Sequence, residues 1–289
     1  MTHRKYEFQG NTMPHSYTKA ELKEHFFSAL ETFNERLDSN ISEDNLLIDF
    51  FNPKNGIAVY ENFCKAHFPQ YLNEPYREEE YFEDVAAQAF AGEDYYGVLI
   101  REDVDFTLGE VLQMFLHEIS HLYCTQNEIP GGHFFDKYCM GSGIKDGMIN
   151  AGYAIWREAI ADIMADSILS EFPSLTLAMV KAEICNLNRE IIFANSCSKK
   201  AMSLVIVYVM ISREVSTIDD WPTAEKKIKK VIDFEEPLMY GILELVFTKL
   251  RTSPFWEITP DFVTELGQMY LELLSLRAMR NKYRETQSI

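Results

Sequence analysis

The pattern His117-Glu118-Ile119-Ser120-His121 contains the residue types and the spacing of a metal-dependent hydrolytic site. Two histidines four residues apart lie one turn apart on the same face of an α-helix, so both imidazole rings can reach one metal ion. The glutamate directly after the first histidine is then placed to accept a proton from a metal-bound water. The pattern therefore predicts that His117 and His121 bind the metal and that Glu118 is the general base.

The residues around this motif predict the helix that it needs. Thr107, with Glu110 three residues later, has the spacing of a capping box, which satisfies the first free N–H groups of a helix. Apolar residues then recur at helical spacing and predict a buried stripe, formed by Leu108, Leu112, Phe115, Ile119 and Leu122. Residues 95–101 precede the helix and are rich in aromatic and aliphatic side chains, which indicates a strand. As an edge strand it would hold an extended substrate backbone.

A catalytic zinc ion usually has three protein ligands, so a third ligand must come from elsewhere. No histidine follows His133, and a downstream ligand must therefore be a carboxylate or a cysteine. Residues 152–166 have a helical pattern that places acidic and small side chains on one face, namely Ala154, Glu158, Ala161, Asp162 and Ala165. The alanines would let this helix approach another one closely. The spacing alone allows either Glu158 or Asp162 to reach the metal.

The H-E-x-x-H motif, followed by a helical E-x-x-x-D, resembles the gluzincin branch of zinc metallopeptidases over roughly residues 95–166. The resemblance implies that His117, His121 and Glu158 are the zinc ligands. It implies that Glu118 is the general base and that Asp162 supports a ligand histidine. Gluzincins often take a histidine or tyrosine that stabilises the transition state from beyond the second helix, and no histidine occurs there in this chain.

The motif and the resemblance lead us to expect a zinc-dependent metallopeptidase that hydrolyses peptide bonds with a Glu-activated, zinc-bound water. One alternative is a zinc hydrolase of a non-protein amide, such as a cell-wall fragment. Another is a non-catalytic binding or regulatory protein with the zincin fold, although the intact Glu118 argues against it. The simplest alternative is a helix whose polar residues only pack. His133, Tyr153 and Tyr208 are the candidates for stabilising an oxyanion.

The composition narrows the expected partners. A net charge of −18 argues against binding to nucleic acids or to anionic membranes, because both need clustered Lys and Arg. The expected partner, a peptide or protein substrate, is therefore the one that the motif indicates. The first 30 residues lack an apolar signal core, and the longest apolar run, residues 201–211, is too short to span a bilayer.

The cysteines predict a reducing compartment. There are five, an odd number, and none forms a C-x-x-C pair, which indicates reduced thiols in a cytoplasmic protein. Cys124 and Cys139 lie near the motif and are alternative metal ligands. A role as small buried apolar residues is the simpler interpretation.

The helical and strand patterns together predict an α+β fold, mostly α-helical, with a zincin-like core. A small N-terminal sheet is expected before residue 105 and a helical body after it. The expected elements are a helix over 18–37 with a capping box at Thr18 and Glu21, a strand over 45–51, a helix over 57–68, and a last helix that opens at Thr259-Pro260. We expect one zincin-like unit over 1–289, with a possible division into 1–124 and 125–289.

The segment between the two helices that are expected to supply the metal ligands is rich in glycine. Six of the 13 glycines fall between residues 131 and 152. Such a segment suits either a lid over the metal site or a plain long connection. We expect residues 131–150, including His133, to border the metal site because they join the two helices that supply its ligands.

Overall fold

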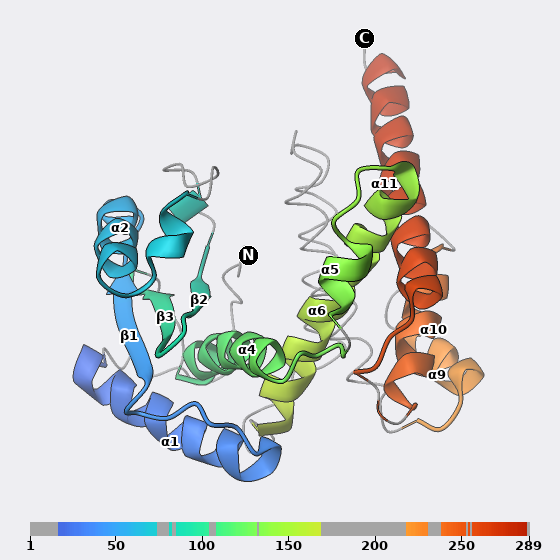
Figure 1. Ribbon diagram of the computed structural model, residues 1–289. Coiled ribbons are helices and arrows are strands. Elements are labelled where there is room, and N and C mark those ends of the chain that lie inside the picture. Colours follow the sequence, from blue (N-terminus) through green and yellow to red (C-terminus); the bar gives the residue numbers. More distant parts are fainter. Residues whose placement is uncertain are drawn as a thin grey trace. The chain divides into compact units, whose positions relative to one another are not determined.

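The computed structural model describes residues 17–73, 81–82, 85–103, 108–131, 133–168, 218–230, 238–252, 254 and 256–287 (Figure 1). The chain divides into two compact units, and each is described by itself. The first comprises residues 1–127 and 161–173, and the second comprises residues 128–160 and 174–289. The expectation of a single zincin-like unit stays a prediction.

The first unit is built on a three-stranded sheet. Its strands β1 (Leu46–Phe51), β2 (Ala87–Ala91) and β3 (Tyr96–Arg101) have the order β1-β3-β2. β3 pairs parallel with β1 and antiparallel with β2. The strands predicted over 45–51 and 95–101 are confirmed, but β3 is central and is not an edge strand. β2 was missed, because its sequence, Ala-Gln-Ala-Phe-Ala, has little of the β-branched and aromatic character that marks strands.

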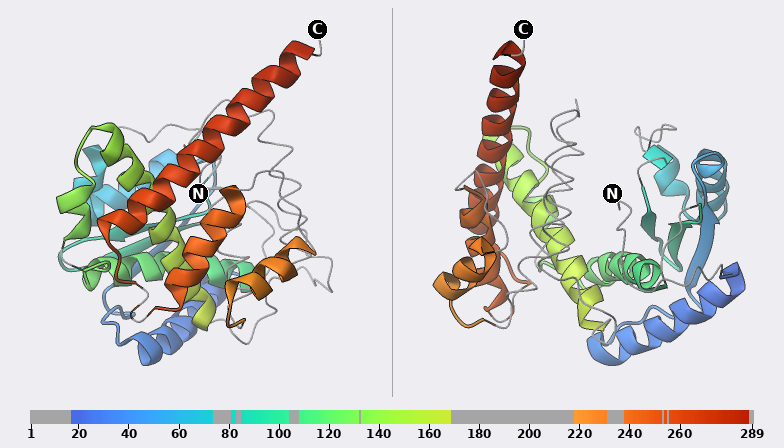
Figure 2. Two further views of the ribbon diagram at one scale, coloured as in Figure 1. Left: turned by 90° about the vertical axis from the view of Figure 1, so that its right-hand side faces the viewer. Right: turned by 180° about the vertical axis from the view of Figure 1, so that it is seen from behind.

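Helices cover both faces of this sheet (Figure 2). On one face lie α1 (Lys19–Leu37) and α4 (Leu108–Gln126), where Phe26 of α1 stacks on Phe115 of α4 at 4.5 Å and also meets Phe50 of β1. On the other face lie α2 (Gly56–His67) and the 3-10 helix η1 (Pro69–Asn73). A buried cluster fills that side, with Phe51, Tyr60, Phe63, Cys64, Phe68, Phe82, Val85, Phe90 and Leu99. Aromatic side chains therefore make up most of the cluster on this face of the sheet.

The capping box predicted for the first helix is confirmed. The Thr18 hydroxyl accepts a hydrogen bond from the Glu21 amide at 3.2 Å, and the Glu21 carboxylate accepts one from the Thr18 amide at 2.7 Å. These contacts with Thr18 lower the pKa of the Glu21 carboxyl. The corresponding Thr107 at the start of α4 lies outside the described residues.

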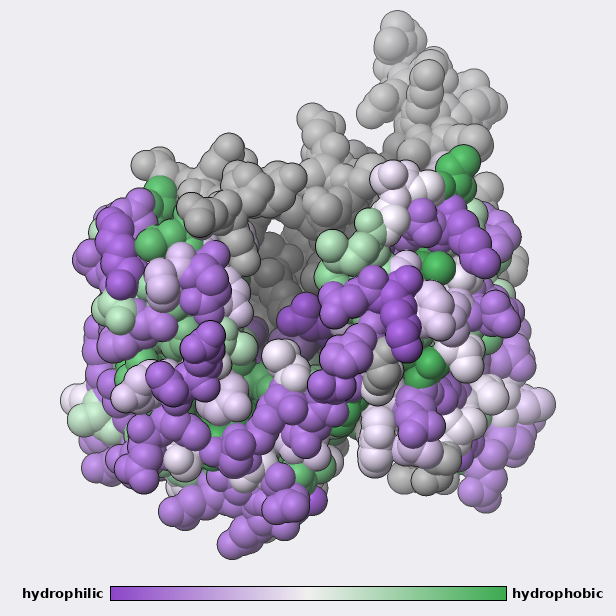
Figure 3. Space-filling view, viewed as in Figure 1, coloured by the Kyte–Doolittle hydropathy of each residue, from purple (hydrophilic) through white to green (hydrophobic). Residues whose placement is uncertain are grey.

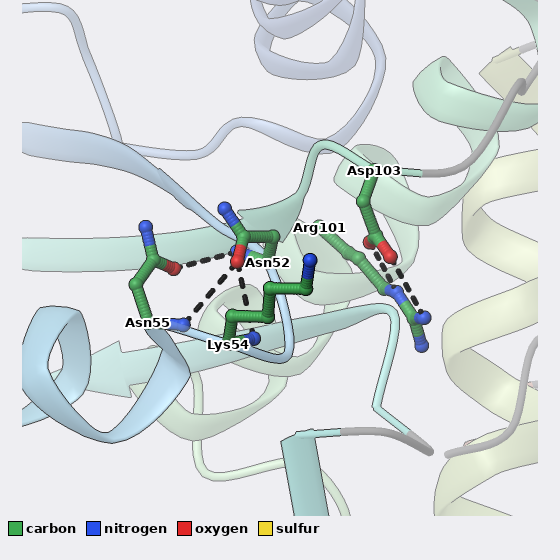
Figure 4. A network of polar contacts seen from close by, with 5 residues as sticks. All are labelled: Asn52, Lys54, Asn55, Arg101 and Asp103. Atoms are coloured by element: carbon green, nitrogen blue, oxygen red, sulfur yellow. Dashed lines mark hydrogen bonds and ion pairs between the residues drawn. The ribbon is translucent and has the colours of Figure 1, made fainter.

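Short polar contacts shape the ends of β1 and β3 (Figure 4). The Asn55 side chain accepts a hydrogen bond from the Asn52 amide at 2.8 Å, and the Asn52 side chain accepts from the amides of Lys54 and Asn55 at 3.1 and 3.2 Å. This reciprocal pair turns the chain from β1 into α2. After β3, Arg101 donates to Asp103 at 2.6 Å and lowers the pKa of its carboxyl.

All the regular elements described in the second unit are helices, joined by turns and irregular segments. The unit contains α5 (Phe134–Tyr138), most of α6 (Ile144–Ile168), α9 (Trp221–Lys229), α10 (Leu238–Leu250) and α11 (Pro260–Gln287). The predicted opening of the last helix is confirmed, since Thr259 accepts a hydrogen bond from the Phe262 amide at 3.2 Å and Pro260 is the first helical residue. α9 begins in the same way, with Asp220 accepting from the Thr223 amide at 2.9 Å.

The α+β prediction, with helices dominant and the sheet before residue 105, is confirmed for the part of the chain that the structure describes. Some expectations fall outside it, among them Tyr208 and the apolar run 201–211. The segment 131–150 is less irregular than expected, because it contains α5 and the first turns of α6. No helix in the described ranges has both the length and the apolar character needed to cross a membrane.

In the second unit, α6 and α11 approach closely through two glycines. A Cβ at Gly152 would overlap the carbonyl oxygen of Val263, and one at Gly267 would overlap that of Met148. The two backbones are therefore in direct contact. This contact anchors the middle of α6, the helix that carries Glu158.

We expect Gly152→Ala to lower the free energy of unfolding by about 1–3 kcal/mol, because the two helices must move apart. Gly147→Ala is the matched control on the same helix. Nothing lies within 4 Å of its added Cβ, and the better helix propensity of alanine should stabilise by up to about 1 kcal/mol. Urea unfolding of both variants measures the difference. Equal effects at the two positions would contradict the close approach.

Candidate metal centre

The motif helix α4 is buried on nearly all sides. It contacts β2, β3 and α1, and twelve of its residues are buried, from Val111 to Cys124. Its polar motif residues are included, with His117 2%, Glu118 5% and His121 4% exposed. Burying three such groups is unfavourable unless partners or a ligand compensate. The predicted apolar stripe accounts for the buried Leu112, Phe115, Ile119 and Leu122 but not for these three.

Asp162 fixes the orientation of the first histidine. Its Oδ1 lies 2.6 Å from Nδ1 of His117, and both side chains are buried. Because a carboxylate accepts hydrogen bonds, Nδ1 of His117 is the protonated nitrogen, and the lone pair of the ring is on Nε2. A carboxylate in this position is the usual support of a metal-binding histidine.

The Nε2 atoms of the two histidines lie close together. Nε2 of His121 lies 3.0 Å from Nε2 of His117, with the rings nearly perpendicular at 86°. Glu158 is buried and completes a group with them, in which the ligand atoms all lie within 4.8 Å of one another. It precedes Asp162 by one turn of α6. Among the described residues, this is the only group of three or more such side chains that could hold a metal ion.

This donor set fits zinc. Two imidazole nitrogens and one carboxylate oxygen are common catalytic zinc ligands, and bonds of ~2.0–2.1 Å at tetrahedral angles separate two ligand atoms by roughly 3.3 Å. The measured separation between the two Nε2 atoms, 3.0 Å, is close to that value. Three protein ligands also leave a fourth position for water or substrate.

Glu118 differs from the other buried acids of the site. The residue is 5% exposed, and its carboxylate has no hydrogen bond or ion pair with another residue that the structure describes. Its oxygens are not among the fully buried polar atoms that lack a partner. Glu118 directly follows a ligand candidate in the sequence and remains available to act on a bound molecule.

The end of α6 is fixed within the first unit. Arg36 of α1 donates a hydrogen bond to the carbonyl of Ser167, and the Cys124 thiol of α4 lies 3.9 Å from the sulfur of Met164. Ala161 and Ala165 are fully buried, as expected for a face of small residues that permits close packing. Ala154 is exposed, and its predicted place on the buried face is wrong.

The remaining candidates lie elsewhere or have other partners. The His133 side chain is 64% exposed at the start of α5, and its Nε2 lies 3.6 Å from a carboxylate oxygen of Glu128. Tyr153 stacks on Phe134 in a buried cluster of the second unit. Tyr208 lies outside the described residues. Cys124 and Cys139 are buried and do not belong to the group that could hold a metal ion. Burial raises the pKa of the Cys139 thiol.

No protein-family model matches this chain, and comparisons with curated proteins and with solved structures found no match either. The assignment of a function therefore depends on the geometry of the site and on the motif that forms it.

Proposed function

We propose that this chain is a zinc-dependent metallopeptidase with a zincin-like core, related in its site to the gluzincin branch. The observation that supports this most strongly is the buried set of His117, His121 and Glu158, with the carboxylate of Glu118 next to His117 in the sequence. Three described cysteines, none of them in a disulfide, agree with the proposed cytoplasmic location.

The proposed roles follow from the positions of the side chains. His117, His121 and Glu158 would hold the ion, and Asp162 keeps His117 in the tautomer that offers Nε2. A zinc ion held there would lower the pKa of a bound water towards ~7 and polarise a carbonyl group. Glu118 would accept a proton from the attacking water and later deliver it to the leaving amine. The burial of Glu118 strengthens these interactions, since little bulk water screens them.

The outer edge of β2 offers a place for an extended peptide. The Arg101 amide donates to the carbonyl of Ala86 at 2.8 Å, and the Gly92 amide donates to the carbonyl of Tyr95 at 2.9 Å. The even-numbered residues of β2 therefore form the backbone hydrogen bonds to β3. The N–H and C=O groups of the odd-numbered residues point to the other side, towards the free edge of the sheet, and these residues are Ala87, Ala89 and Ala91.

Part of that edge is already covered. The backbone of Ala91 is engaged by the side chains of Tyr71 and Gln70. Among the described residues no further strand pairs with β2, which contacts the motif helix α4. Ala87 and Ala89 are thus the positions at which a substrate backbone would add as a strand.

Cleavage of a peptide library by the zinc-loaded protein tests the proposal. We expect hydrolysis that stops when a chelator removes the metal and returns when zinc is added back. The matched control is Glu118→Gln, loaded with zinc in the same way. Hydrolysis of small amides or of cell-wall fragments, but not of peptides, would favour the alternative zinc amidase. Chelator-insensitive cleavage would contradict a metal mechanism.

A further inference from the structure

The second unit exposes a group of large apolar side chains around the connection from α5 to α6. They are Phe135, Tyr138, Met140 and Ile144, and we call them the α5–α6 patch. Their exposed fractions are 47%, 39%, 70% and 84%. In Figure 3, hydrophobic residues reach the surface around this connection, in a molecule whose visible surface is mostly hydrophilic. Contiguous exposed apolar residues of this kind often mark a binding surface.

The patch is held in place by the residues beneath it. Phe134 is 4% exposed and stacks on Tyr153 with ring centroids 5.8 Å apart, which anchors the inner side of α5. Cys139 is also buried, in the same cluster. The Asp146 carboxylate accepts a hydrogen bond from the Gly143 amide at 2.8 Å and so fixes the start of α6. The outward side chains are therefore presented by a fixed backbone.

The size of the patch favours a short apolar segment over a second copy of the chain. Large side chains present about 150–250 Å² each, so four of them at these exposures offer roughly 360–600 Å². A stable dimer needs about 800 Å² from each partner. A few apolar side chains of an extended polypeptide would fill the smaller area.

The patch is connected to the metal centre by one helix. Glu158 follows Ile144 by 14 residues in α6, which is continuous from Ile144 to Ile168. At ~1.5 Å per residue this is about 21 Å along the helix axis. An extended chain covers that length in about six residues.

We propose that the α5–α6 patch binds an apolar segment of a polypeptide substrate whose cleavage site lies several residues away, at the metal. The inference rests on the proposed peptidase function and narrows its substrate class. Unfolded or extended polypeptides should be preferred over short peptides, because only long chains reach both sites. The patch supplies binding energy without contacting the scissile bond.

The test uses fluorescently labelled casein as an unfolded substrate and a short peptide selected from the library. We expect the double variant Met140→Ser/Ile144→Ser to raise KM for casein about tenfold with kcat unchanged, as the loss of two apolar contacts predicts. Cleavage of the short peptide should stay within about twofold, because it does not reach the patch. The double variant Leu72→Ser/Leu271→Ser is the matched control, since both residues are 37% exposed and lie outside the patch.

Binding without turnover separates this inference from the peptidase proposal. Anisotropy of labelled casein with Glu118→Gln protein should show affinity that the patch substitutions weaken about tenfold. If casein binds in this way but no peptide is ever cleaved, the peptidase proposal fails and the patch stands. Unchanged casein affinity in the patch variant would overturn the inference. Dissociation of a dimer by the same substitutions, seen by analytical ultracentrifugation, would do so as well.

Discussion

Glu118→Gln is expected to retain the metal and to lose peptidase activity, with kcat lower by about 10²- to 10⁴-fold. The amide has nearly the same shape as the carboxylate but cannot accept the proton of the attacking water. Within the described residues the Glu118 side chain makes no hydrogen bond or ion pair. The substitution therefore removes no structural contact there, and thermal stability should remain close to that of the wild type.

Three measurements on the same preparation separate chemistry from folding and metal binding. Elemental analysis gives the zinc content, thermal unfolding gives stability, and single-turnover kinetics gives the rate of cleavage. Glu110→Gln is the matched control, because Glu110 lies in the first turn of the same helix and outside the motif. It should retain wild-type kcat. Full activity in Glu118→Gln would remove this residue from the mechanism and with it the main support for a peptidase.

Local patterns in the sequence predicted most helices and two of the three strands. Capping residues and periodicity act over one or two turns, and they were sufficient for α1, whose box at Thr18 is present. β2 was not predictable in this way. Its alanines are in a strand because β3 supplies their hydrogen bonds, and no local preference of theirs indicates it.

The candidate site was predictable only in part, for a related reason. The helical repeat places His117 and His121 on one face, and it places Glu158 and Asp162 on one face of another helix. How those faces meet depends on the packing of α4 against the end of α6, which the spacing does not contain. In the structure Asp162 contacts Nδ1 of His117, and Glu158 belongs to the group that could hold a metal ion, together with His117 and His121.

Packing between helices, which the sequence spacing of residues does not reveal, also explains two further differences from expectation. Ala161 and Ala165 are buried, whereas Ala154, on the same predicted face, is exposed. A helical face is buried only over the length at which a neighbouring element covers it. Gly147 belongs to the expected connection over 131–150, but it lies inside α6, which begins at Ile144. At Gly152 the absence of a side chain permits the contact with α11.

Metal binding should distinguish the two acids of α6. We expect one equivalent of zinc per chain and its loss in His121→Ala and in Glu158→Ala, because each substitution removes one of only three protein ligands. Asp162→Asn should keep the metal but bind it about 10- to 100-fold more weakly, since the amide supports the His117 ring less well.

Competition with a chromophoric chelator measures these affinities, and His133→Ala is the control, as a histidine whose side chain is 64% exposed and outside the group. Its zinc content and affinity should equal those of the wild type. Zinc retained in Glu158→Ala but lost in Asp162→Asn would show that the two acids have the opposite roles. In that case the 2.6 Å contact between Asp162 and His117 would be a feature of the metal-free site, and binding of the ion would have to turn the His117 ring and draw Asp162 inward. Retention of one equivalent in all three variants would place the metal elsewhere in the chain, and Glu118 would then have no metal beside it to act with.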